Sequence, residues 1–473
     1  MHSGFAILPC ITGNGFFLLL WGGAETGTGF GFLALELGRS LAMTKRIFLF
    51  TWLLTLVLLI SFATEGSAEN QGVSLDALVQ EAIENNPEIL ALKKKHEVYQ
   101  ERVPRAGALE DPMLGFGIVN LPNNFSFTEE DMTMKEVSIS QMLPFPGKRA
   151  AMREAAGEEA QAVSNEIEEK AVVVIRDVKN AYLELSHIDR TMEVTERNKG
   201  ILESFAKIAE SRYSVGEGIQ QDVLKARVEI SRMVDDLIML GQQRIATEAK
   251  LCSLLNRSGD CLIGRPAELK FQKHPITIQS LQGEALEANP TLARMKNMVE
   301  AKKKELRVAK LDYYPDFRVR LAYGQRDNGR DEMGEEMYRR DVLTGMVEIN
   351  LPIFYRSKQD RRVAEALSDI HSVEAQYNGM KNEIFYMIAS MASMAGRAER
   401  QLELYQTGII PQTGAQVKSA LSAYTVNKVD FMSVLDAQMT LYRYELEYHG
   451  ALTEYEKNLA SLEAAVGKRF ERK

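Results

Sequence analysis

Residues 81–92 read EAIENNPEILAL, and residues 284–295 read EALEANPTLARM, so one motif occurs twice, 203 positions apart. Solenoid proteins repeat units of only roughly 20–50 residues, so this spacing indicates duplication of a whole architecture. We therefore predict two structural copies, residues 69–270 and residues 271–473.

Further matches between the two copies follow the first one along the chain. VSISQMLPF, which begins at Val137, matches VEINLPIF, which begins at Val347. YSVGEGIQQDVLKAR, which begins at Tyr213, matches YTVNKVDFMSVLDAQ, which begins at Tyr424. The same order of matches in both halves predicts the same order of structural elements.

Each copy is expected to open with a helix, over residues 75–108 and 279–310. These helices should end before Asp111-Pro112 and Tyr314-Pro315, because proline disfavours helical backbone in the residue that precedes it. Two short segments of period two follow in each copy, and this period indicates β-strands. Their alternating apolar positions are Leu114, Phe116, Ile118, Val137, Ile139, Phe317, Val319, Leu321, Tyr323, Leu343, Val347 and Ile349.

Strands of this length with one apolar face and one small or polar face suit the wall of a membrane β-barrel. Arg318, Arg320 and Glu348 lie on the polar side of the alternation and are candidates for the barrel lumen. Four strands cannot close a barrel alone, since open edges in lipid leave backbone groups unpaired. The pattern therefore requires more than one copy of the chain.

Long helical runs follow the strand pairs. From Arg149 to Tyr213 almost no helix breaker occurs, and apolar residues recur at three-and-four spacing, as in a coiled-coil seam. Some 60 residues at about 1.5 Å each span roughly 90 Å. We predict turns at residues 214–218 and 425–428, each followed by a returning helix, and a kink or helix start at Pro411. The fold class is therefore mainly α with a small β part.

The beginning of the chain carries an export signal. Residues 43–46 are a short basic segment, an apolar run follows over residues 47–63, and small residues precede Glu69, so we predict a signal peptide over residues 43–68. The alternative, a transmembrane anchor, fits less well because the run is short for a membrane span. Residues 1–42 are interpreted as a spurious upstream extension.

Composition excludes several functions. The net charge of −8 argues against a nucleic-acid partner. No nucleophile constellation or phosphate-binding loop is present, so we predict neither an enzyme nor a cofactor. The histidines are scattered without zinc-like spacing, and no metal site is expected. Cys252 and Cys261, nine positions apart in an exported chain, favour a local disulfide over a metal-binding pair.

Two copies of helix, strand pair and long helical hairpin resemble the TolC-like family of outer-membrane efflux proteins. The resemblance covers about residues 75–467 and rests on ENNPEI, QMLPFPGKR, IIPQ and AYTVNKVDFMSVLDAQMTLY. It implies a homotrimer in the outer membrane with a large periplasmic portion. Three chains would form a 12-stranded β-barrel continued by a 12-helix α-barrel. It also implies a periplasmic adaptor protein and an inner-membrane pump, of the RND type, as partners.

The resemblance further assigns positions near the helical turns. Asp222 matches an acidic gate residue, Tyr424 matches its tyrosine partner, and Asp436 matches one aspartate of a ring that narrows the aperture. Ser433 and Val429 replace a second ring aspartate and a linking arginine, which predicts a gate that is weaker or differently closed. The turns are expected to face the adaptor through Val215, Gly216, Gly218, Val426, Asn427 and Lys428.

Three functions remain open. The first is the exit channel of an efflux system, with metal cations favoured because QMLPFPGKR and KVDF are most similar to the heavy-metal branch of the family. The loop residues Met132, Met134, Met333 and Met337 are candidate soft-metal ligands. The second is the outer-membrane channel of a type I protein secretion system. The third, a periplasmic coiled-coil adaptor, would explain the hairpins but not the strands with an apolar face.

Overall fold

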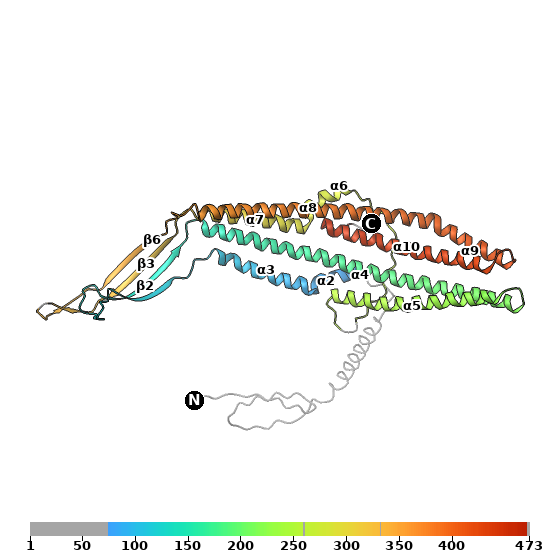
Figure 1. The fold of residues 1–473 in the computed structure, drawn as a ribbon, viewed down its shortest axis with the longest axis horizontal. Helices are drawn as coiled ribbons and strands as arrows, with labels where there is room; N and C mark the ends of the chain where they lie inside the picture. Colours follow the sequence, from blue (N-terminus) through green and yellow to red (C-terminus); the bar gives the residue numbers. More distant parts are fainter. Residues whose placement is uncertain (1–73, 259–260, 332, 471–473) are drawn as a thin grey trace, which may run out of the picture. The chain divides into compact units, whose positions relative to one another are not determined.

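The elements of the first copy recur in the second in the same order (Figure 1). The first copy comprises α2 (Leu75–Asn85), α3 (Pro87–Ala106), β1 (Met113–Val119), β2 (Met134–Leu143), α4 (Lys148–Ser214) and α5 (Gln220–Leu254). The second comprises α6 (Ile278–Ala288), α7 (Pro290–Leu311), β3 (Phe317–Gln325), β6 (Val342–Ile349), α8 (Gln359–Leu404), a π-helical turn (Tyr405–Ile409), α9 (Ile410–Thr425) and α10 (Phe431–Val466). The predicted fold class and the duplication are thereby confirmed.

This computed structural model describes residues 74–258, 261–331 and 333–470, which belong to one compact unit, residues 71–473. The predicted signal peptide and the upstream segment lie outside the described residues. Two short strands in the second strand-connecting loop, β4 (Gly329–Arg330) and β5 (Glu336–Met337), were not predicted from the sequence. No helix within the described ranges is long and apolar enough to cross a membrane.

The prediction of a single opening helix in each copy was wrong. Each helix is divided in two, at Asn86 and at Asn289, where ψ is 124° and 119°. Both asparagines cap the following helix, since Asn86 Oδ1 accepts from the Glu88 amide at 3.0 Å and Asn289 Oδ1 from the Leu292 amide at 3.1 Å. The proline that follows each asparagine suits the first helical position, because its missing N–H needs no partner there.

One antiparallel sheet joins the two copies in the order β1-β2-β3-β6, with β1 and β6 at its edges. The register aligns Leu114, Ile139 and Leu321 in one row across three strands. Because facing residues point to the same side of a sheet, the predicted apolar positions share one face.

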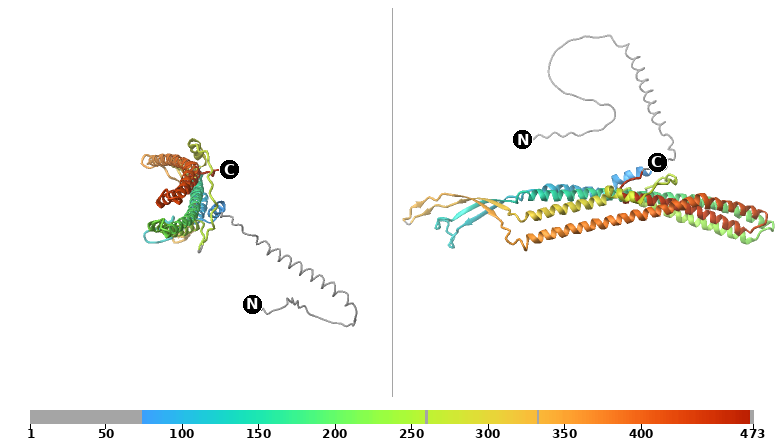
Figure 2. Two further views of the ribbon diagram at one scale, coloured as in Figure 1. Left: turned by 90° about the vertical axis from the view of Figure 1, so that its right-hand side faces the viewer. Right: turned by 90° about the horizontal axis from the view of Figure 1, so that it is seen from above.

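The long helices extend away from the sheet and place two helical turns at the far end of the unit (Figure 1). α4 alone has 67 residues, or roughly 100 Å at 1.5 Å per residue. The predicted seam is buried from Val174 to Ile188. Seen end-on in Figure 2, the long helices form a curved layer. The break expected at Pro411 is present, because α9 begins at Ile410 after the π-helical turn.

Candidate functional site

One face of the sheet is apolar and uncovered. Phe116, Tyr323 and Leu343 lie in one row of the register, and they are 76%, 48% and 77% exposed. Isolated apolar side chains on a surface are ordinary, but a contiguous apolar face of four strands marks a contact with lipid or protein. The other exposed apolar residues of this face are Leu114, Ile118, Val137, Ile139, Leu321, Val347 and Ile349.

The opposite face of the sheet carries the three predicted lumen residues. Arg318 faces Glu348 across β3 and β6, and their side chains form an ion pair at 3.2 Å. Arg320 forms an ion pair with Glu136 of β2 and donates to the Ser138 hydroxyl at 3.3 Å. The structure therefore adds Glu136, which neutralises one arginine of this face. Glu136 precedes the apolar Val137 in the period-two pattern, and this position on the polar side was the sequence signal for it.

The methionines of the strand-connecting loops differ in accessibility. Met333 is 92% exposed and Met132 is 50% exposed, and Met337 is also exposed. Met134 is 9% exposed and packs against Gly324. A Cβ atom at position 324 would clash with the Met134 sulfur. Met134 is thus not accessible as a metal ligand. No cluster of three or more His, Cys, Asp or Glu side chains suited to a metal ion occurs in the part of the chain that the structure describes.

The two helical turns have the same backbone design. Gly216 (φ 78°) and Asn427 (φ 59°) take left-handed conformations at matching positions. In each turn a following amide reaches back to a helix carbonyl: Gly218 donates to Arg212 at 3.1 Å, and Lys428 donates to Ala423 at 2.9 Å. Glycine and asparagine are the residues that tolerate this helix-ending geometry best. Of the predicted tip residues, Gly218 is half-buried and the rest are exposed: Val215, Gly216, Val426, Asn427 and Lys428.

Behind the turns, the two helical hairpins pack together around Tyr424. Its ring is only 4% exposed and meets Phe431 edge-on at 5.7 Å. Arg212 lies 4.5 Å from the Tyr424 ring centroid and donates to the Tyr424 carbonyl at 2.6 Å. Sequence reasoning missed Arg212, although its counterpart in the second copy is Ala423, and this difference between the copies was a readable signal.

A scan against protein-family models matches the outer membrane efflux protein family over residues 78–257 and 281–468. The chain belongs to the outer membrane efflux protein family. This family consists of transport channels rather than enzymes. Its members lie in the outer membrane, form trimers and function with an adaptor and an inner-membrane pump.

Individual relatives agree with this assignment. The cobalt-zinc-cadmium resistance protein CzcC of Cupriavidus metallidurans is 25% identical over 273 residues, which are 56% of this chain and 60% of that protein. The fold resembles that of a Pseudomonas aeruginosa membrane protein (TM-score 0.72, 15% identity, 84% and 91% of the two chains). It also resembles the outer membrane protein VceC of Vibrio cholerae (TM-score 0.70, 18% identity, 85% and 98%).

In this outer membrane efflux protein, two of the predicted gate residues, Asp222 and Tyr424, interact electrostatically. Burial raises the pKa of Asp222, the charge of Asp430 adds to the rise, and Arg212 opposes it. Burial likewise raises the pKa of Tyr424, while the charge of Arg212 lowers it and the charge of Asp222 raises it. The Tyr424 hydroxyl is buried, and it has no hydrogen-bond acceptor among the described residues. The protomer therefore holds a buried phenol on which the charges of both Arg212 and Asp222 act.

The third predicted gate residue, Asp436, is placed differently. Asp436 is exposed on α10, and its side chain makes no hydrogen bond or ion pair within the described ranges. Ser433 instead takes part in the N-terminal cap of α10. Its amide and its hydroxyl both donate to the side chain of the capping residue Asp430, at 2.9 and 2.5 Å. Val429, which is half-buried, packs against the apolar cluster at the turns. Serine and valine thus have local structural roles at these two positions.

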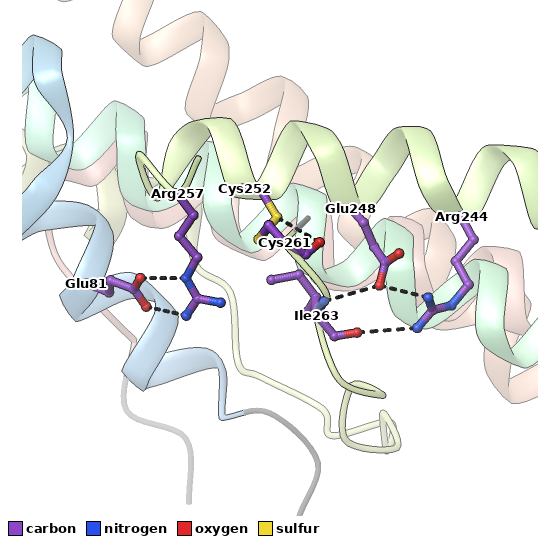
Figure 3. Close-up of a disulfide and its surroundings, with 7 residues drawn as sticks. All are labelled: Glu81, Arg244, Glu248, Cys252, Arg257, Cys261 and Ile263. Carbon is purple, nitrogen blue, oxygen red and sulfur yellow. Dashed lines mark hydrogen bonds and ion pairs between the residues drawn. A yellow bond between two sulfur atoms is a disulfide. The ribbon is translucent and has the colours of Figure 1, made fainter. Parts of the chain in front are cut away.

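A disulfide joins Cys252 at the end of α5 to Cys261 in the segment between the copies (Figure 3). The same region holds the Arg257–Glu81 ion pair at 2.7 Å, which ties the segment to α2. Glu248 accepts from the Ile263 amide at 3.3 Å. The disulfide therefore fastens the connecting segment against the middle of the helical layer.

Proposed function

We propose that this chain is one protomer of a homotrimeric exit duct that conducts substrate from the periplasm through the outer membrane. The observation that carries the proposal is the sheet: its apolar face is exposed, and its outer strands β1 and β6 have free edges. In lipid such edges must be paired, because unpaired backbone groups cost several kcal/mol each. Three copies joined β1 to β6 give 12 strands in a closed barrel.

The same three-fold arrangement turns the curved layer of long helices into a 12-helix tube in the periplasm. Its open end then presents the two turns of each protomer to a periplasmic adaptor and, through it, to an inner-membrane pump of the RND type. The exposed Val215 and Val426, 69% and 61% accessible, supply apolar contacts for the adaptor. The duct itself is passive, since energy enters at the pump.

The gate of this duct is proposed to form from Asp222, Tyr424 and Asp436. The buried Tyr424 hydroxyl has no hydrogen-bond acceptor among the described residues, and the charge of the Asp222 carboxyl group acts on it. In the closed trimer these groups would pair between neighbouring hairpins. Three exposed Asp436 carboxylates around one axis would favour cations and repel anions.

Metal cations are the proposed substrate class. Support comes from the relative CzcC, whose name records cobalt, zinc and cadmium resistance. The test is a deletion strain complemented with this chain: restored tolerance to Co²⁺, Zn²⁺ and Cd²⁺ is expected. Unchanged metal tolerance with restored secretion of a protein would instead point to type I secretion.

The architecture is tested separately, by the native mass of protein extracted with detergent from purified outer membranes. A stable trimer is expected. A monomer in the soluble periplasmic fraction would refute the duct and favour a coiled-coil adaptor.

A further inference from the structure

A pocket of about 300 Å³ lies where the sheet gives way to the long helices. It is lined by the start of α4, the segment between α7 and β3, the segment after β6 and the first turn of α8. Its charged side chains are three cations and two anions: Lys148, Lys358, Arg362, Asp312 and Asp316. The lining therefore carries one excess positive charge.

Four of these charges are already satisfied by one another. Lys148 forms ion pairs with Asp312 at 2.7 Å and with Asp316 at 3.0 Å, and Arg362 pairs with Asp312. Lys358 is different. Its side chain is exposed and makes no ion pair or hydrogen bond with any residue that the structure describes. The excess charge is thus concentrated on one free ammonium group.

A second group in the pocket also lacks a partner. Gln359 is 8% exposed, and its Oε1 is buried without a hydrogen bond among the described residues. An unpaired polar atom in a buried position is unfavourable, so such atoms usually have a hydrogen-bond partner. An acceptor oxygen beside a free ammonium group suits a ligand that has both an anionic oxygen and a hydrogen-bond donor.

The rim of the pocket is apolar. Leu351, Ile353 and Phe354 are 70%, 70% and 72% exposed. In the first copy the matching Leu-Pro segment is packed, because Phe145 stacks on Tyr314 with ring centroids 4.4 Å apart. The rim therefore extends the exposed apolar face of the sheet beyond β6.

We propose that this pocket binds the headgroup of a glycerophospholipid from the periplasm-facing leaflet. The phosphodiester pairs with Lys358, the ammonium or hydroxyl group of the headgroup donates to Gln359, and the acyl chains lie along Leu351, Ile353 and Phe354. Juxtamembrane lysines attract anionic lipid groups in this way. The leaflet assignment rests on the proposed function, which places the long helices in the periplasm.

The test is native mass spectrometry of the detergent-extracted protein titrated with single phospholipids. Phosphatidylethanolamine or phosphatidylglycerol should bind with one site per chain. Phosphatidylcholine should bind more weakly, because its choline group has no hydrogen-bond donor. Lys358→Gln should weaken binding roughly fivefold, the effect of one juxtamembrane lysine. Gln359→Leu should abolish the preference over phosphatidylcholine, and Lys418→Gln, at an exposed lysine of α9, is the matched control.

Equal lipid binding by wild type and Lys358→Gln would overturn the proposal. The proposal would also be overturned if the cysteine of Phe354→Cys did not react with a bulky maleimide in delipidated trimers. A second copy of the chain would then cover the pocket. Metal tolerance and native mass test the proposed exit duct, whereas lipid titration tests the lipid site. If tolerance is normal and the protein is a trimer, but lipid binding does not depend on Lys358, only the lipid site is refuted.

Discussion

The side-chain amide of Asn289 donates a hydrogen bond of 2.8 Å to the carbonyl oxygen of Ala465, at the end of α10. Asn86 makes the equivalent bond to Leu254, at the end of α5, at 3.1 Å. Each asparagine also caps its own helix. The duplicated Asn-Pro motif thus ties the beginning of each copy to the end of the same copy.

Substitution of Asn289 should separate these two roles. Asn289→Ser keeps a capping oxygen but leaves the buried Ala465 carbonyl unpaired, at a cost of about 1–3 kcal/mol. Asn289→Ala also loses the cap, which adds about 1 kcal/mol. The apparent melting temperature in detergent should fall in the order wild type, Ser, Ala. Asn382→Ser, at an exposed helical position, is the control, and equal losses in both Asn289 variants would contradict the capping role.

The buried ion pair between Lys179 and Glu463 links α4 of the first copy to α10 of the second, and both side chains are under a tenth exposed. Removing one partner leaves an uncompensated buried charge. Lys179→Met should therefore lower the free energy of unfolding by about 3–5 kcal/mol. Lys179→Met with Glu463→Gln should recover much of this loss, because the amide still accepts from the Phe470 amide. The measurement is a double-mutant cycle on unfolding.

The exposed pair Lys94–Glu97, with side chains 77% and 58% accessible, provides the control for that cycle. Lys94→Met should cost less than about 1 kcal/mol. Additive effects of the two core substitutions would mean that Lys179 and Glu463 do not act as a pair.

The disulfide between Cys252 and Cys261 closes a short loop. The chain-entropy relation for a loop of this size gives about 2–3 kcal/mol of stabilisation. Cys252→Ser with Cys261→Ser should therefore lower the apparent melting temperature, and a reducing agent should lower that of the wild type but not of the double variant. An unchanged melting temperature in the double variant would show that the ion pairs of the connecting segment suffice.

The strands and the long helices were predictable from the sequence because their apolar periods, two and three-to-four, differ sharply. The helix breaks at Asn86 and Asn289 were missed, since buried positions such as Leu78 and Ile89 continue on both sides of the break. The Asn-Pro pair itself was the signal. The contact of Arg212 with the Tyr424 carbonyl joins residues 212 positions apart, and no local pattern encodes such a pairing.

The gate can be tested by single-channel conductance in planar bilayers. Tyr424→Phe keeps the buried ring but removes the hydroxyl, and Asp222→Asn removes the carboxylate charge. Each should raise the open probability, and the double variant should add little if the two groups form one link. Asp436→Asn should reduce cation selectivity without changing open probability. Wild-type conductance in all three variants would refute the gate assignment.

His449 should make stability depend on pH. Burial, with the charges of Arg190, His187 and Arg197, lowers its pKa from 6.5 to about 4, against a small opposing effect of Glu193. Arg190 Nε donates to His449 Nε2 at 3.3 Å, and only a neutral imidazole can accept that bond. Burial likewise lowers the pKa of His187.

The sign follows from linkage. Because the folded pKa of His449 is lower than the unfolded one, the unfolded chain binds the proton first as pH falls. The contribution of His449 to stability is therefore complete above pH 6.5, declines between pH 6.5 and 4, and is absent below. The apparent melting temperature should fall over this window, and His449→Gln should flatten the decline. His371→Gln, at an exposed histidine of α8, should leave it unchanged, and an equally steep decline in His449→Gln would assign the pH dependence to other groups.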